Sequence, residues 1–119
     1  MLLLALPLAA QGKPHMIMVK MVDAPNAQFA FQPSNIDAHP GDTLRFVQAS
    51  AAPHDVAFRK RPKAAKLGAA ATGPYLVSVG QTYDLVVDGR FAEGVYDFVC
   101  DPHEGAGMHG TLTVGSSTK

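Results

Sequence analysis

Residues 94–114 read GVYDFVCDPHEGAGMHGTLTV and place two strand patterns on either side of a short loop. Tyr96 and Phe98 alternate with smaller or polar residues up to Cys100, which predicts a strand whose inner face carries both rings beside the thiol. The loop holds the one cysteine of the chain, a histidine three residues later and a methionine five residues after that. A thiol, an imidazole and a thioether are all soft or borderline metal ligands, so this hinge between two strands is a candidate metal site.

The rest of the chain consists of short apolar runs separated by turns such as HPGD at 39–42. Residues 59–74 are basic, then rich in Ala and Gly, and are predicted to form a loop with one helical turn near 63–67. About eight short strands, punctuated by Gly and Pro and without a long helix, predict an all-β sandwich. The strands are predicted at 17–22, 28–32, 43–47, 56–58, 75–79, 82–87, 94–100 and 111–114.

Composition favours one globular domain. The chain has 119 residues, 47% of them hydrophobic, and 10 basic residues balance 10 acidic ones. Zero net charge argues against nucleic-acid binding, which depends on neutralising phosphates. Five basic residues nevertheless gather in one block: Arg59, Lys60, Arg61, Lys63 and Lys66. Such a block is either a solvated loop or a patch that steers a charged partner.

The first residues predict export. The apolar run from Leu2 to Ala10 ends in small residues, as in a secretory signal, and it is too short to span a bilayer. Residues 1–10 are therefore interpreted as the remnant of a signal peptide and residues 11–119 as one domain, periplasmic or otherwise exported, with no stable membrane insertion. A single cysteine forms no internal disulfide, so the thiol of Cys100 is free, reactive or bound to metal.

A copper site with two imidazoles, one thiolate and a weak axial Met requires a second histidine beside His103. His15 lies near the predicted cleavage site, His39 lies in a Pro-Gly turn, and His109 directly follows Met108 and should point away from it. His54 remains, at the start of a strand behind Pro53, where the stiff backbone can hold the ring.

With these residues in place, the sequence resembles the plastocyanin and pseudoazurin branch of the cupredoxins, the type 1 blue copper proteins. The resemblance covers nearly all of the predicted mature chain, in the family's order. It rests on VKM (19–21), FAFQPSNIDAHPGDTLRFV (29–47), PHDVAF (53–58), QTYDLVV (81–87) and, most specifically, GVYDFVCDPHEGAGMHGTLTV (94–114).

The resemblance implies a Greek-key β-sandwich with one type 1 copper held by His54, Cys100, His103 and Met108. It implies a soluble, monomeric electron carrier rather than an enzyme, which exchanges one electron at a time with transient donor and acceptor proteins. The edge of the His103 ring would reach the surface within a patch of small or apolar residues: Phe29, Pro53, Gly105, Ala106 and Gly107.

The chain departs from the family pattern in several places. Many members have Asn after the first histidine, and here it is Asp55. Plant plastocyanins carry acids where this chain has Arg59, Lys60 and Arg61, and a Tyr where it has Val99. The inverted charge predicts that one redox partner presents an acidic face.

Other functions stay open. A copper-binding module for delivery in the periplasm is the main alternative, an enzyme would need additional copper centres, and zinc is disfavoured because thioether is a poor zinc ligand. Three further methionines, Met16, Met18 and Met21, could handle copper, but they are interpreted as core residues of a strand.

Overall fold

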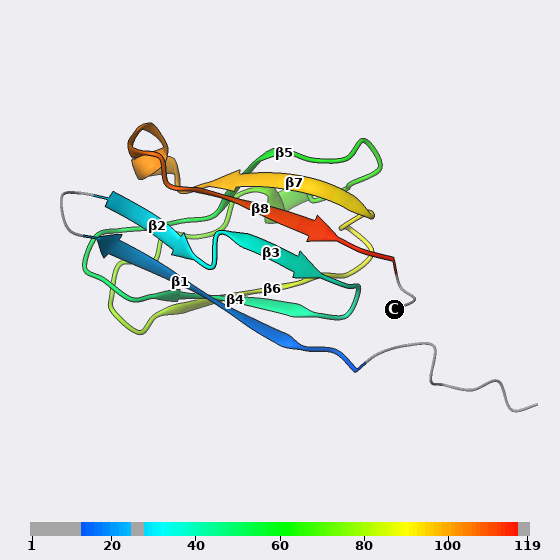
Figure 1. Cartoon of the computed structure of the whole chain (residues 1–119), viewed down its shortest axis with the longest axis horizontal. Helices are drawn as coiled ribbons and strands as arrows, with labels where there is room; N and C mark the ends of the chain where they lie inside the picture. The colour runs from blue at the N-terminus through cyan, green and yellow to red at the C-terminus, as the bar shows by residue number, and fades with distance from the viewer. Residues whose placement is uncertain (1–12, 25–27, 117–119) are drawn as a thin grey trace, which may run out of the picture.

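The computed structural model describes residues 13–24 and 28–116, which form two four-stranded sheets packed face to face (Figure 1). The predicted all-β sandwich is confirmed. The predicted signal segment at 1–10 lies outside the described residues. In spatial order, the first sheet contains β2 (Gln28–Gln32), β1 (Met16–Ala24), β4 (Thr43–Gln48) and β6 (Thr82–Val86), and the second contains β3 (Asn35–Ala38), β8 (His109–Val114), β7 (Gly94–Val99) and β5 (Ala57–Lys60).

Both sheets are mixed. β1 pairs in parallel with β4, and β3 pairs in parallel with β8, whereas the other neighbours are antiparallel. Parallel neighbours cannot be joined by a tight hairpin, so the chain crosses between the sheets repeatedly. The crossings hold the two sheets together and bring loops from both to the end of the sandwich where β7 stops.

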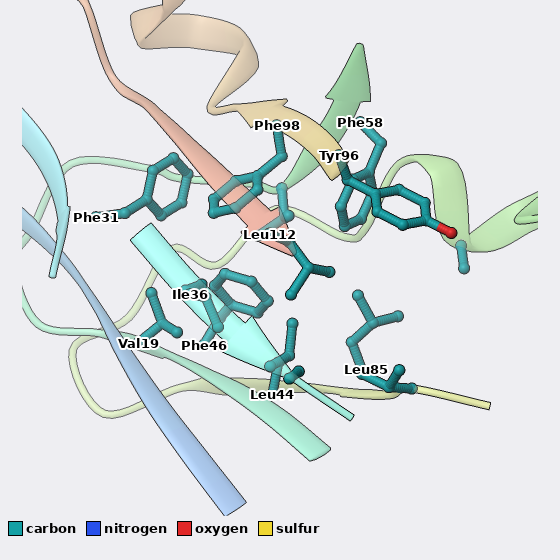
Figure 2. Packing of buried hydrophobic residues seen from close by; sticks show 14 of the residues in the cluster. Val19, Phe31, Ile36, Leu44, Phe46, Phe58, Leu85, Tyr96, Phe98 and Leu112 are labelled. Carbon is teal, nitrogen blue, oxygen red and sulfur yellow. The ribbon is translucent and has the colours of Figure 1, made fainter. Parts of the chain in front are cut away.

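Aromatic rings fill the space between the sheets (Figure 2). Phe98 on β7 lies at their centre, with its ring centroid 4.8 Å from that of Phe31, 5.9 Å from Phe46 and 5.8 Å from Phe58. These contacts are edge-on, the arrangement that aromatic quadrupoles prefer. Tyr96 is also fully buried, as the alternation along this strand predicts.

Two predictions about strands were wrong. β3 was not predicted, because it is four residues long with only Ile36 and Ala38 facing the core, and it is defined by pairing with the distant β8. Residues 75–79 form no strand; only Leu76 pairs, through an isolated bridge to His54. The side chain of Gln81 accepts the N–H groups of Val77 and Ser78, so these amides need no neighbouring strand.

The helical turns and methionines also differ from expectation. A 3₁₀ turn, η2, lies at Gly68–Ala71 rather than near 63–67. Met21 is buried in the core as predicted, but Met16 and Met18 are about half exposed. The alternation of β1 explains this, since Val19 and Met21 share the inner face and Met18 must point outward. None of the helices in the described part of the chain is long and apolar enough to cross a membrane.

Candidate metal centre

Cys100 lies directly after the last residue of β7, and its side chain is fully buried. It continues the inward-facing row of Tyr96 and Phe98, which fixes the direction of the thiol. Its backbone N–H donates to the carbonyl of Met108 (3.1 Å), and its carbonyl accepts from the N–H of His103 (3.1 Å). Backbone bonds therefore hold the cysteine against both ends of the loop that follows.

That loop is a 3₁₀ helix, η3 (Asp101–Ala106), which begins with Pro102 in its first turn and ends at Gly107. Gly107 has φ +88°, a left-handed conformation in which a side chain would be strained, and its N–H donates back to the helix. This turn brings the N–H of Met108 within 3.1 Å of the carbonyl of His103. The Met108 side chain is fully buried. A tight, short loop thus places three of the four expected ligands.

His54 comes from the connection between β4 and β5. Two backbone hydrogen bonds with Leu76, of 3.1 and 2.8 Å, fix its main chain, and the imidazole is fully buried. Its Nδ1 lies 3.6 Å from the sulfur of Cys100, and Nδ1 of His103 lies 3.4 Å from the same sulfur. Within the described residues, these three side chains form the one group of acidic, histidine or cysteine ligands close enough to hold a metal ion, with their ligand atoms within 4.8 Å of one another.

The ionisation of these groups suits a metal that replaces protons. Burial raises the pKa of the Cys100 thiol to about 11, and the nearby carboxyls of Asp55 and Asp101 add to the rise. Burial also lowers the pKa of His54, which outweighs the opposite effect of a neighbouring carboxylate. The site without metal thus contains a protonated thiol and a neutral imidazole, and a bound cation would displace the thiol proton.

The far side of the His54 ring contacts Asp23 at the end of β1. His54 Nε2 lies 2.9 Å from Asp23 Oδ1, and the other carboxylate oxygen accepts the N–H of Ala52 at 3.1 Å. Partial burial opposes ionisation of Asp23, but hydrogen bonds from Ser50, Ala52 and His54 hold its pKa below the usual range. No local pattern predicts this contact, because Asp23 and His54 are 31 residues apart.

Contacts made by Asp55 and Arg59 attach the η3 loop to β5 and to the segment that precedes β5. Asp55 is buried, and its Oδ1 accepts the N–H of Asp101 at 2.6 Å, while its Oδ2 has no hydrogen-bond partner among the described residues. Burial, with Asp101 nearby, raises the pKa of Asp55 to about 6. Arg59 on β5 forms ion pairs with Asp101 and with Glu104, the latter at 2.9 Å. The guanidinium therefore bridges two acids of the loop.

His103 is half-buried, and Phe29 of β2 covers one face of its ring. The two ring centroids are 3.7 Å apart with the planes inclined by 15°. The predicted patch residues Pro53, Gly105, Ala106 and Gly107 are exposed. The remaining histidines do not join the group: His15 and His39 contact Asp42, and His109 approaches the carbonyl of Gly107.

Comparisons with known proteins identify a family of copper binding proteins. A family model described as copper binding proteins of the plastocyanin/azurin family matches residues 17–115. Plastocyanin of Scenedesmus fuscus is 33% identical over 93 residues, which cover 76% of this chain and 92% of that protein. Plastocyanin of Vicia faba is 34% identical over 98 residues, which cover 79% of this chain and 96% of that protein.

Solved structures show the same architecture. A mutant plastocyanin of fern is 30% identical and superimposes with a TM-score of 0.66, over 82% of this chain and 98% of that one. Pseudoazurin from Methylobacterium extorquens AM1 is also 30% identical, with a TM-score of 0.62, over 84% of this chain and 75% of that one.

Proposed function

Since the chain belongs to the plastocyanin/azurin family of copper binding proteins, we propose that it carries electrons through one copper ion held by His54, Cys100, His103 and Met108. It is a blue copper electron-transfer protein. When bound, copper supplies a one-electron couple between Cu(II) and Cu(I), and a set of two imidazoles, one thiolate and a weak thioether suits both states.

One observation carries the ligand assignment: the Nδ1 atoms of both imidazoles face the sulfur of Cys100, at 3.6 Å for His54 and 3.4 Å for His103. The backbone bonds among Cys100, His103 and Met108 keep these donors in place whether or not the charge on the metal changes. A site that is held by the fold reorganises little when an electron arrives, which favours fast transfer.

We propose that electrons enter and leave through the edge of the His103 ring. Among the four assigned ligands it alone is not buried, and the small residues Gly105, Ala106 and Gly107 that follow it in the loop are exposed, so a partner protein can approach closely. The stacked ring of Phe29 holds the imidazole at this surface.

We further propose that one partner presents an acidic face. Arg59 belongs to the basic block by sequence, but Asp101 and Glu104 neutralise it. Lys60, Arg61, Lys63 and Lys66 form no ion pair with any described residue, so four cations remain to attract acids. Replacing Lys60 and Lys63 with Gln should slow association with a carboxylate-rich redox partner and flatten its salt dependence. An unchanged association rate and salt dependence would contradict the proposal that one partner presents an acidic face.

The apolar run at Leu2–Ala10 supports an exported location, and N-terminal sequencing of the protein recovered from the periplasm tests it. Membership of the plastocyanin/azurin family supports a carrier rather than an enzyme. Assay of the purified protein for oxidase and nitrite reductase activity tests that part.

The central test is a visible and EPR spectrum with one equivalent of Cu(II), before and after ascorbate. An intense blue thiolate-to-copper band, a narrow hyperfine splitting and reversible bleaching are expected. Cys100→Ser should abolish the blue band, while His109→Gln, at an exposed histidine outside the group, should retain it. A pale complex in the native protein would contradict the assignment and favour the alternative role in copper delivery.

A further inference from the structure

Asp23 connects the first sheet to the inner face of the metal centre. Its Oδ1 lies 2.9 Å from Nε2 of His54, and its Oδ2 accepts the N–H of Ala52 at 3.1 Å. Ser50 approaches from the same side, with its hydroxyl 3.4 Å from the same ring nitrogen. His54 is fully buried, and 29% of the Asp23 side chain is exposed. A carboxylate thus contacts the buried imidazole on the side opposite the cysteine.

We propose that Asp23 is a positioning residue of the copper site, which holds His54 as the Nε2–H tautomer and shifts the centre toward Cu(II), so that it lowers the reduction potential. The inference rests on the proposed function, since it takes His54 as a copper ligand.

The tautomer follows from the two sides of the ring. A carboxylate accepts hydrogen bonds and donates none, so the close nitrogen, Nε2, must carry the proton. The lone pair then resides on Nδ1, the nitrogen that faces Cys100 Sγ at 3.6 Å. A metal-ligating histidine whose other nitrogen donates to a carboxylate has a fixed ring orientation and a more basic ligand atom.

The negative charge of Asp23 also affects which oxidation state of the metal is favoured. A carboxylate behind the ligand stabilises a dication more than a monocation, so Asp23 favours the oxidised metal. Because the ring and the carboxylate are both held by further contacts, the pair cannot reorient to relax this preference. Asp23 bonds to Ala52, and the His54 main chain bonds to Leu76. The two histidines therefore differ: His54 is a buried ligand held by further contacts, whereas His103 is a ligand whose ring edge is exposed.

The test compares Asp23→Asn with Asp37→Asn in the copper-loaded protein. Asp37 is an exposed acid on β3, so its variant removes the same charge away from the ligands. We expect Asp23→Asn to weaken Cu(II) binding relative to Cu(I) by about tenfold or more, the usual scale for such outer contacts. Tenfold corresponds to a rise of about 59 mV in reduction potential, beyond any rise in the control. An equal shift in both variants would overturn the electrostatic role.

A second measurement uses the native protein, so it requires neither copper nor a folded variant. Imidazole ¹⁵N–¹H correlation spectra of the metal-free native protein should show His54 protonated at Nε2 and bare at Nδ1. Protonation at Nδ1 would overturn the positioning role. If the native protein formed no blue complex, the proposed function would fail, and the tautomer would still decide whether Asp23 positions the ring.

Discussion

The ring of Phe29 lies nearly parallel to the imidazole of His103, with 3.7 Å between their centroids and 15° between their planes. Phe29 belongs to β2 in the first sheet, whereas His103 belongs to the loop that follows β7 in the second. The contact therefore joins the two sheets at the end of the sandwich where the metal centre lies. It also covers one face of the ligand that is proposed to exchange electrons.

Phe29→Leu should remove the stack and leave the His103 ring more mobile. A stacked aromatic pair contributes about 0.5–1.5 kcal/mol beyond the area it buries, so the free energy of unfolding of the metal-free protein should fall by about 1 kcal/mol. Urea unfolding measures this loss. Tyr75→Leu is the matched control, because Tyr75 is an exposed aromatic, 56% accessible, that stacks on no described ring. Equal losses in the two variants would show that the stack contributes nothing specific.

Gly110→Ala should destabilise the protein by about 1–3 kcal/mol, the usual range for overpacking a core. A Cβ at this position would lie 2.4 Å from Cζ of Phe98, which is its neighbour across β7 and β8, and 2.8 Å from the carbonyl oxygen of Ser34. Because the oxygen belongs to the backbone, it cannot swing aside. Gly105→Ala, where nothing lies within 4 Å of the new Cβ, should be nearly neutral in the same unfolding experiment.

The sequence predicted the features that depend on local spacing. Alternation placed Tyr96, Phe98 and Cys100 on one inner face, and the short loop explains why His103 and Met108 return to the cysteine. The second histidine could be identified only by excluding the other histidines and from the family resemblance, because His54 lies 46 residues from Cys100 along the chain. Its approach to the sulfur in the structure agrees with that choice, while the assignment of the four ligand residues stays a proposal.

The features that sequence reasoning missed depend on contacts between distant segments. Asp23 reaches His54 only because β1 ends beside the β4–β5 connection, and nothing in the residues around Asp23 indicates this. The sequence groups Arg59 with four other cations in the basic block, but the fold places it against Asp101 and Glu104. β3 is too short for a clear periodic pattern, and its pairing with β8 defines it. Such contacts follow from the topology rather than from local sequence preference.

Alkaline pH should weaken the contribution of Tyr96 to stability. Burial raises the pKa of Tyr96 above its ordinary value of 10.0, and its hydroxyl donates to the carbonyl of Ala92 at 2.6 Å. The folded state therefore binds this proton more tightly than the unfolded chain does. The stabilisation is complete below pH 10 and is lost as the pH rises through the folded-state pKa.

Tyr96→Phe gives the measurement, since it removes both the hydroxyl and its titration. At pH 8 the variant should be about 1 kcal/mol less stable, the usual net worth of one hydrogen bond. The gap between native protein and variant should narrow above pH 10 in urea unfolding experiments. Taking the difference cancels the other groups that titrate there, such as Tyr83, whose pKa burial also raises. A gap that stays constant from pH 8 to pH 11 would contradict the prediction.

Asp55→Asn should raise the reduction potential of the copper-loaded protein. The amide oxygen of Asn can still accept the N–H of Asp101, so the link between the two ligand segments survives while the charge is removed. At pH 8, above the pKa of about 6, the native carboxyl is ionised and favours Cu(II). By Coulomb's law, two unit charges on the order of 8 Å apart at an effective dielectric constant of about 20 interact by roughly 2 kcal/mol, which sets the scale of the effect.

That energy corresponds to about 90 mV at 59 mV per tenfold change, and Arg59 nearby should reduce it to some tens of millivolts. A redox titration at pH 8 measures the rise, and Arg59→Gln in the same series should enlarge the effect of Asp55→Asn, because it removes the opposing charge. The blue band should keep its intensity in Asp55→Asn, since no ligand changes. A potential that did not rise would mean that the Asp55 charge does not reach the metal, although its oxygen holds the loop.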